Sequence, residues 1–417
     1  MKLRLLGPGF ILALLAIPSA AYAQSSAPAP LTLPQVLQIA RTKNPLLLSS
    51  AQHLDATEAA QITAGLRQNP TFTLSGANTT LPANNPSSPY TYIGNISRLF
   101  ELGQKRRWRL QIADATTGVT KSQIDDQERQ TVLQVKDAFT NMLAAKAALQ
   151  VAQNNLDSYR KTVELSKTRL DAGDISKTDF ERIDLQLAEF ESDYETAKLD
   201  LVQASDTLQL LMGVERVSAD FDIVGPLQPP AVATTLPQLE QDALVHRPDF
   251  LAAQQSVVLA DANVKLANAD ATTDPTIGAE YERVGVFNSA GFQVSIPLRV
   301  FDRNQGEKGR TRYEAQSARF ALTAARNQVL NDVDQAWAAC NSALAMAARY
   351  NNQYVAESER VRANLEFSYR RGGASLLDYL DALRDYRQIQ LDALAADQQV
   401  WLSLHQLSFA AATEVVP

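Results

Sequence analysis

Two long segments of the chain carry apolar residues spaced alternately three and four apart, the heptad pattern of a coiled coil. The first, about 103–170, contains no proline, and at 1.5 Å per residue it predicts a helix on the order of 100 Å long. The second, about 175–212, keeps the pattern without a miss from Phe180 to Leu211. Because such a seam must pack against a partner helix, we expect long paired helices.

The sequence contains an internal repeat. TLPQVLQIARTKNP at 32–45 returns as TLPQLEQDALVHRP at 235–248, and later short stretches also recur about 200 residues apart. This self-similarity predicts two copies of one structural unit, at 24–212 and 235–412. The stretch between them, 213–234, contains Gly-Pro and Pro-Pro pairs and is typical of a linker, and a short tail follows at 413–417.

Each unit predicts the same order of elements: a helix, two strands and two long helices. The opening helix of the first unit is expected from about Pro34 to Gln68. The strands are expected at about 71–80, 90–100, 276–286 and 291–301, with a turn near Asn288 in the second pair, and the long helices of the second unit at about 305–370 and 375–410. In the last strand, apolar Phe292 and Val294 alternate with polar Gln293 and Ser295, so one sheet face is apolar.

Four strands with one apolar face cannot close a barrel alone. In lipid, an open sheet edge leaves backbone groups without hydrogen bonds, at several kcal/mol each. If the strands enter a membrane, other copies of the chain must complete the barrel, and three copies would supply twelve strands. The alternative is a soluble sheet with ordinary aromatic content.

The N-terminus is typical of a secretory signal peptide, expected at residues 1–23. Lys2 and Arg4 precede a short apolar run, and Ala21-Tyr22-Ala23 forms an A-x-A cleavage site. The alternative is a membrane anchor, although no stop-transfer flank follows. No cysteine lies near the cleavage site, so we expect an exported protein that is not lipidated.

Composition excludes several classes of function. The net charge is −7, and the only basic cluster is Lys105–Arg107, which argues against nucleic-acid binding. The single cysteine, Cys340, cannot form an internal disulfide. The three histidines lie far apart and no catalytic or phosphate-binding motif is present, so we expect no enzyme activity, no cofactor and no metal site.

The duplicated halves, paired strands and long helices broken at a glycine resemble the TolC-type outer-membrane efflux protein family over nearly the whole mature chain. FELGQKRRWR (100–109) and PLRVFDRNQGEKGR (297–310) more closely resemble its heavy-metal branch, which serves exporters of the cobalt–zinc–cadmium type. The resemblance implies a mainly α, trimeric α/β-barrel channel: a 12-stranded outer-membrane β-barrel continuous with a 12-helix periplasmic tunnel. It also implies two partners, a periplasmic adaptor and an inner-membrane, proton-driven RND-type pump.

The resemblance places gating and adaptor docking at the two breaks between long helices, 169–180 and 368–381. The residues that it implies are Gly173, Thr178, Asp179, Tyr369, Arg370, Arg371, Gly372, Asp378 and Asp381. Asp378 and Asp381 share a helical face, so a trimer would place six carboxylates around a constriction and select cations. Multidrug members carry an arginine two residues after the second glycine, where this chain has Ala374.

The resulting functional hypothesis is a passive exit channel for divalent heavy-metal cations. Multidrug or solvent efflux and type I protein secretion are alternative cargoes for the same channel. A periplasmic coiled-coil adaptor is a further alternative, but it would contain a single hairpin, whereas this chain predicts two complete copies of the unit.

Overall fold

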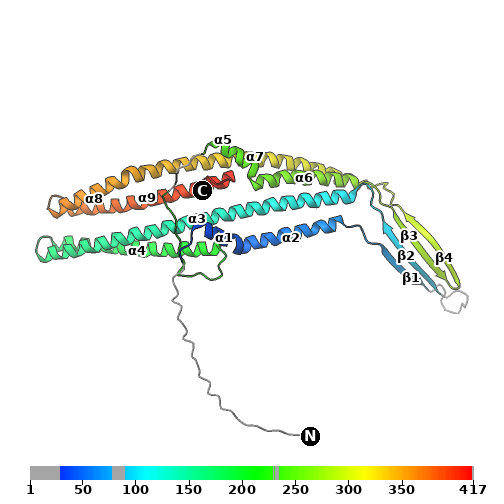
Figure 1. Ribbon diagram of the computed structural model, residues 1–417, viewed down its shortest axis with the longest axis horizontal. Helices are drawn as coiled ribbons and strands as arrows, with labels where there is room; N and C mark the ends of the chain where they lie inside the picture. The colour runs from blue at the N-terminus through cyan, green and yellow to red at the C-terminus, as the bar shows by residue number, and fades with distance from the viewer. Residues whose placement is uncertain (1–28, 78–89, 229, 231–233, 416–417) are drawn as a thin grey trace, which may run out of the picture.

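The computed structural model describes residues 29–77, 90–228, 230 and 234–415. The expected signal peptide lies outside the described residues, as do the loop expected between the first two strands and the last three residues, 78–80, of the first expected strand. The protein is an elongated rod with a small sheet at one end and the turns of two long helical hairpins at the other (Figure 1).

The two copies have the same order of elements, as the sequence predicts. The first contains α1 (Leu33–Lys43), α2 (Pro45–Gly65), β1 (Thr71–Ala77), β2 (Thr91–Leu99), α3 (Lys105–Asp171) and α4 (Lys177–Leu211). The second contains α5 (Leu236–His246), α6 (Pro248–Ala269), β3 (Thr276–Val284), β4 (Phe287–Ser295), α7 (Gln305–Arg349), the π-helical turn η1 (Tyr350–Tyr354), α8 (Val355–Arg370) and α9 (Leu376–Ala411).

The opening helix differs from the expectation, because it is two helices in each copy. The chain breaks at Asn44 between α1 and α2, and at Arg247 between α5 and α6. Both residues precede a proline and have extended backbone, with ψ of 119°. A residue before proline is disfavoured in the helical region, and proline itself is well suited to the first position of the next helix. A single helix from 34 to 68 was therefore the wrong prediction.

The last strand also differs from the expected 291–301. β4 spans Phe287–Ser295 and so begins four residues earlier than predicted, because the hairpin turns at Gly285 and Val286. Gly285 has φ of +57°, which a two-residue hairpin turn needs at its first position. Pro297 follows soon after Ser295, and proline cannot supply a ladder N–H.

The long helix expected at 305–370 is interrupted. Five residues, Tyr350 to Tyr354, form a π-helical turn between α7 and α8. In the first copy, by contrast, α3 runs for 67 residues without a break and confirms the long helix predicted there. The two hairpins are therefore not identical in build.

The four strands form one antiparallel sheet in the order β1-β2-β3-β4. Their register places the large apolar side chains on one face, here called the apolar sheet face, where each is at least 46% exposed: Phe72, Leu74, Tyr92, Ile96, Ile277, Tyr281, Phe292 and Val294. The other face, the polar sheet face, carries mainly hydroxyl, amide and carboxylate groups. No helix covers the apolar sheet face in Figure 1, so this single chain leaves it bare.

Three hydrophobic clusters hold the helices together. One joins α1, α3 and α4 with the linker, and a second joins α5, α6, α7 and α9. The third lies toward the hairpin turns and joins α3 and α4 to the first part of α9 through Tyr159, Phe190, Leu380 and their neighbours. The two copies are therefore packed against each other along the rod.

The linker wraps around the middle of the rod, here called the equator. Ile223 is fully buried and pairs as an isolated β-bridge with Leu31, next to α1. Lys146 of α3 forms an ion pair with Asp222, and the Trp401 indole of α9 donates to the Leu227 carbonyl. Contacts to both copies make this linker part of the packed structure.

Candidate functional site at the helical tip

The candidate site comprises the turns between paired helices at the end of the rod far from the sheet, residues 172–176 and 371–375, here called the tip turns (Figure 1). Gly173 has φ of +81° and Gly372 has φ of +73°, and nothing lies within 4 Å of a Cβ built on either. Each glycine N–H donates back to the residue three before it, and the next N–H donates to the residue five before it. This is the Schellman helix end, so both glycines are needed for their left-handed backbone.

A serine and an aspartate begin the helix after each tip turn. In the first, the Ser176 hydroxyl accepts from the Asp179 N–H and donates to the Asp179 carboxylate at 2.8 Å. In the second, Ser375 and Asp378 make the same exchange, at 2.7 Å to the carboxylate. The sequence interpretation missed both serines, although the shared pattern G-x-x-S-x-x-D could have indicated them.

The two tip turns are brought together by stacked side chains. The Arg169 guanidinium of α3 lies 5.4 Å from the centroid of the Tyr369 ring of α8. That ring in turn stacks on Tyr379 of α9, with centroids 5.4 Å apart and planes within 2°. Burial raises the pKa of both tyrosine hydroxyls, so both stay neutral, and the two rings contribute through packing.

The remaining predicted tip residues make local contacts in one chain. Arg370 pairs with Glu366 on its own helix, and Arg371 lies over the Phe367 ring, 4.2 Å from its centroid. Asp381 lies 3.4 Å from Arg384 and its side chain is half exposed. Thr178 is exposed. Within the described chain, Asp378 and Asp381 therefore have different partners, a serine for the first and an arginine for the second.

A half-buried ion pair below the tip joins the two hairpins and was missed by the sequence interpretation. Arg387 of α9 contacts Glu189 and lies 3.0 Å from Asp193, both on α4, while its own side chain is only 13% exposed. Its guanidinium also lies over the Phe190 ring. The hydrogen bond from Arg387 lowers the pKa of Glu189. We call this contact the Arg387 lock. Its sequence signal was a charged residue, Arg387, at the next position of the apolar seam Leu376, Leu380, Leu383.

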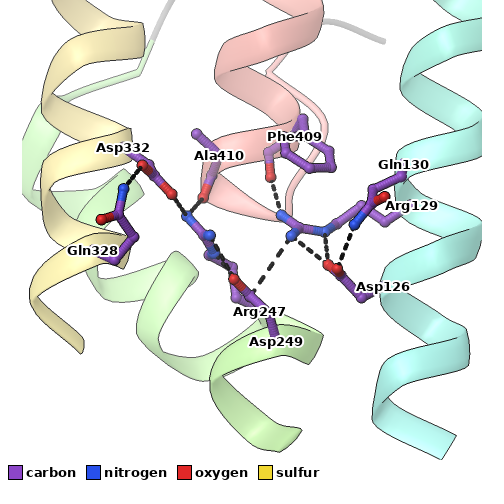
Figure 2. Close-up of polar contacts among 9 residues, drawn as sticks. All are labelled: Asp126, Arg129, Gln130, Arg247, Asp249, Gln328, Asp332, Phe409 and Ala410. Carbon is purple, nitrogen blue, oxygen red and sulfur yellow. Dashed lines mark hydrogen bonds and ion pairs between the residues drawn. The ribbon is translucent and has the colours of Figure 1, made fainter. Parts of the chain in front are cut away.

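A second charge network lies at the equator (Figure 2). Arg247, with a side chain 4% exposed, pairs with Asp249 at 2.6 Å and with Asp332 of α7 at 2.9 Å. Its guanidinium also donates to the Ala410 carbonyl at the end of α9. Arg129 of α3 pairs with Asp126 and donates to the Phe409 carbonyl. We call these five charged residues, Asp126, Arg129, Arg247, Asp249 and Asp332, the equatorial clamp.

The clamp holds α9 to helices of both copies. Carbonyls at a helix end lack the usual helical partner, and two guanidiniums supply donors here, to the Ala410 carbonyl and, beside the Ala412 N–H, to the Phe409 carbonyl. Burial alone would raise the pKa of Asp249, but its hydrogen bonds and charge contacts with Arg247 and Arg129 lower it overall, so the carboxylate stays ionised. In the first copy, the equivalent contact is neutral: the Asn44 amide donates to the Leu211 carbonyl at 2.8 Å.

Within the part of the chain that the structure describes, no three or more His, Cys, Asp or Glu side chains gather where they could hold a metal ion. The same residues contain no helix that combines the length and the hydropathy needed to cross a membrane.

Comparison with known proteins identifies the fold and the family. The family model for outer membrane efflux proteins matches residues 36–214 and 239–413, that is, both copies. The solved structure of CusC superposes with a TM-score of 0.77 at 18% identity, covering 97% of this chain and 99% of that one.

Two curated relatives span nearly the whole chain. The cobalt-zinc-cadmium resistance protein CzcC of Cupriavidus metallidurans is 25% identical over 89% of this chain and 88% of its own length. The pyoverdine export outer membrane protein OpmQ of Pseudomonas putida is also 25% identical, over 90% of this chain and 83% of its own length. The duplicated fold, the tip turns and the family match agree, and the chain belongs to the outer membrane efflux protein family.

Proposed function

We propose that the chain is the outer-membrane exit channel of a tripartite, proton-driven RND-type efflux system, acting as a homotrimer. The observation that supports this proposal most strongly is the exposure of the sheet. Its apolar face is bare, and β1 and β4 each have a neighbouring strand on only one side within the described residues. Lipid would accept the apolar face but not the unpaired edges, so β1 of one copy is expected to pair with β4 of the next. Three copies then give a closed 12-stranded barrel.

The helices supply the periplasmic part of the proposed channel. Twelve long helices from three copies would continue the barrel as a tunnel, and the tip turns would close it where a periplasmic adaptor docks. Asp378 and Asp381 would line that constriction, with one oxygen of Asp378 already held by Ser375. Arg370, which pairs with Glu366 of its own helix, and Arg371, which lies over the Phe367 ring, are available to contact a neighbouring copy in place of the arginine that multidrug members carry at the position of Ala374.

Divalent heavy-metal cations are the proposed cargo. The support is the pair of stretches at 100–109 and 297–310, together with the similarity to the cobalt-zinc-cadmium resistance protein. The equally similar pyoverdine export protein favours a small organic cargo instead. In either case the channel is a passive conduit, neither an enzyme nor a stoichiometric metal binder, and it needs no cofactor. The inner-membrane pump then determines which substrate is exported.

A deletion strain tests the cargo. Loss of the gene is expected to lower the tolerated concentration of zinc, cobalt or cadmium by several-fold, with tolerance restored by the wild-type gene from a plasmid. Hydrophobic drugs and a siderophore-dependent growth test serve as parallel arms. Unchanged metal tolerance with a loss of drug tolerance or siderophore export would replace metal cations by the organic cargo.

A further inference from the structure

Within the described strands, the polar sheet face carries acidic charge and no basic charge. In the described strands, its ionisable side chains are Glu280 and Glu282 of β3. Glu280 lies opposite Asn95 and Gly291, and Glu282 lies opposite Ile93 and Ser289, so neither faces a cation across a strand. Among the residues that the structure describes, no ion pair involves either carboxylate, although both residues are partly buried.

The basic residues of the sheet lie on the opposite side. Arg98 pairs in register with Ile277 and Arg283 with Tyr92, which places both on the apolar sheet face. They lie near the two ends of the strands, where a long side chain can reach the membrane surface. The charges are therefore sorted by face, with carboxylates on one side and guanidiniums at the margins of the other.

From this sorting we infer that Glu280 and Glu282 line the pore within the barrel and make its membrane portion select cations over anions. The inference rests on the proposed trimer, in which the apolar sheet face meets lipid and the polar sheet face encloses the pore. Three copies would give two rings of three carboxylates, about 7 Å apart along the strand. Rings of acidic side chains are a general device for cation selectivity.

This selectivity is separate from that expected at the tip. Strand β3, which carries both glutamates, lies at the opposite end of the rod from the hairpin turn at which α9, with Asp378 and Asp381 near its start, begins (Figure 1). A cation that leaves the tunnel would meet these rings last, and an anion would be repelled there. Because the Debye length is about 10 Å at 0.1 M salt and about 3 Å at 1 M, the preference should be strongest in dilute salt.

The test is the reversal potential of the mature chain in planar bilayers under a potassium chloride gradient. Glu280→Gln with Glu282→Gln is expected to lower the cation-over-anion permeability ratio by about threefold or more near 0.1 M salt, and by less near 1 M. Arg283→Gln, the neighbouring position on the other face, is the matched control and should leave the ratio unchanged. An unchanged ratio in the glutamate variant would overturn the inference while leaving the channel itself intact.

Thiol labelling tests the same placement without relying on conductance. With Cys340, the chain's single cysteine, replaced by alanine, Glu282→Cys should react with a charged, membrane-impermeant thiol reagent, whereas Tyr281→Cys should be protected by lipid. Equal labelling of the two positions, or faster labelling of the second, would contradict the placement. Failure of the wild-type chain to form any conducting oligomer would instead overturn the proposed function, and the inference with it.

Discussion

Replacing Arg247 with methionine is expected to lower the free energy of unfolding by about 1.5–3 kcal/mol, the usual contribution of hydrogen bonds to a charged group, because its two carboxylate partners are 38% and 30% exposed and keep part of their hydration. Methionine fills much of the same volume, but the Asp249 and Asp332 carboxylates and the Ala410 carbonyl lose their shared donor. The Arg247 side chain is 4% exposed, so water cannot readily take its place. The midpoint of guanidinium unfolding, followed by far-UV circular dichroism, measures the change.

Arg319→Met is the matched control for this variant. Arg319 also joins α7 to α6, through Asp261 at 2.8 Å, but its side chain is 53% exposed, and an exposed pair contributes about 0–1 kcal/mol. Adding Asp249→Asn and Asp332→Asn to Arg247→Met should recover much of the loss, because neither position then carries a carboxylate that has lost its cation. Equal effects of Arg247→Met and Arg319→Met would show that the equatorial clamp does not hold α9.

Arg387→Met is expected to loosen the contact between the two hairpins near the tip. The substitution removes a charged hydrogen-bond donor from Glu189 and Asp193, a loss of about 1.5–3 kcal/mol in local stability. Amide hydrogen exchange in residues 376–390 and 180–194 should accelerate by about tenfold or more, since local opening carries the exchange there. If the tip closes the channel as proposed, the resting conductance in a bilayer should rise as well.

The control is Arg384→Met on the same helix. Its side chain is 60% exposed, and its ion pairs are with Asp381 and Asp385 of α9 itself. Exchange should be nearly unchanged in that variant, and matching acceleration in both would remove Arg387 from the role of a lock. The pKa of Glu189 is lowered in the folded chain, so the ion pair contributes its full stability at pH values above 4.5, the ordinary pKa of a glutamate. That stability is lost as the pH falls through the lowered pKa.

The sequence could predict the repeated order of elements because each rests on a strong local pattern. The heptad seam from Phe180 to Leu211 predicted both ends of α4 to within two residues. The long run without proline predicted α3. The apolar and polar alternation at 292–295 correctly assigned the faces of β4 even though its bounds were wrong. Periodicity reports which face is buried more reliably than where an element begins.

What the sequence did not predict depends on contacts between distant segments. The breaks at Asn44 and Arg247 were visible in the prolines that follow, but an alanine-rich apolar pattern on both sides favoured a continuous helix. The π-helical turn at Tyr350–Tyr354 has no local sequence signal of comparable strength. Arg247 and Arg387 are single charges whose partners come from elsewhere in the chain, so their importance appeared only once the helices were placed.

Cross-linking between sheet edges tests the shared barrel most directly. In the Cys340→Ala background, one cysteine replaces Thr73 on β1 and a second replaces Ser289, Gly291 or Gln293 on β4, with the mature chain in detergent or lipid. Within one copy β2 and β3 separate these edges by about 14 Å, beyond the reach of a disulfide. The account predicts that at least one pair gives covalent species ending at the trimer; a chain that stays monomeric in every pair, and soluble without detergent, would contradict it.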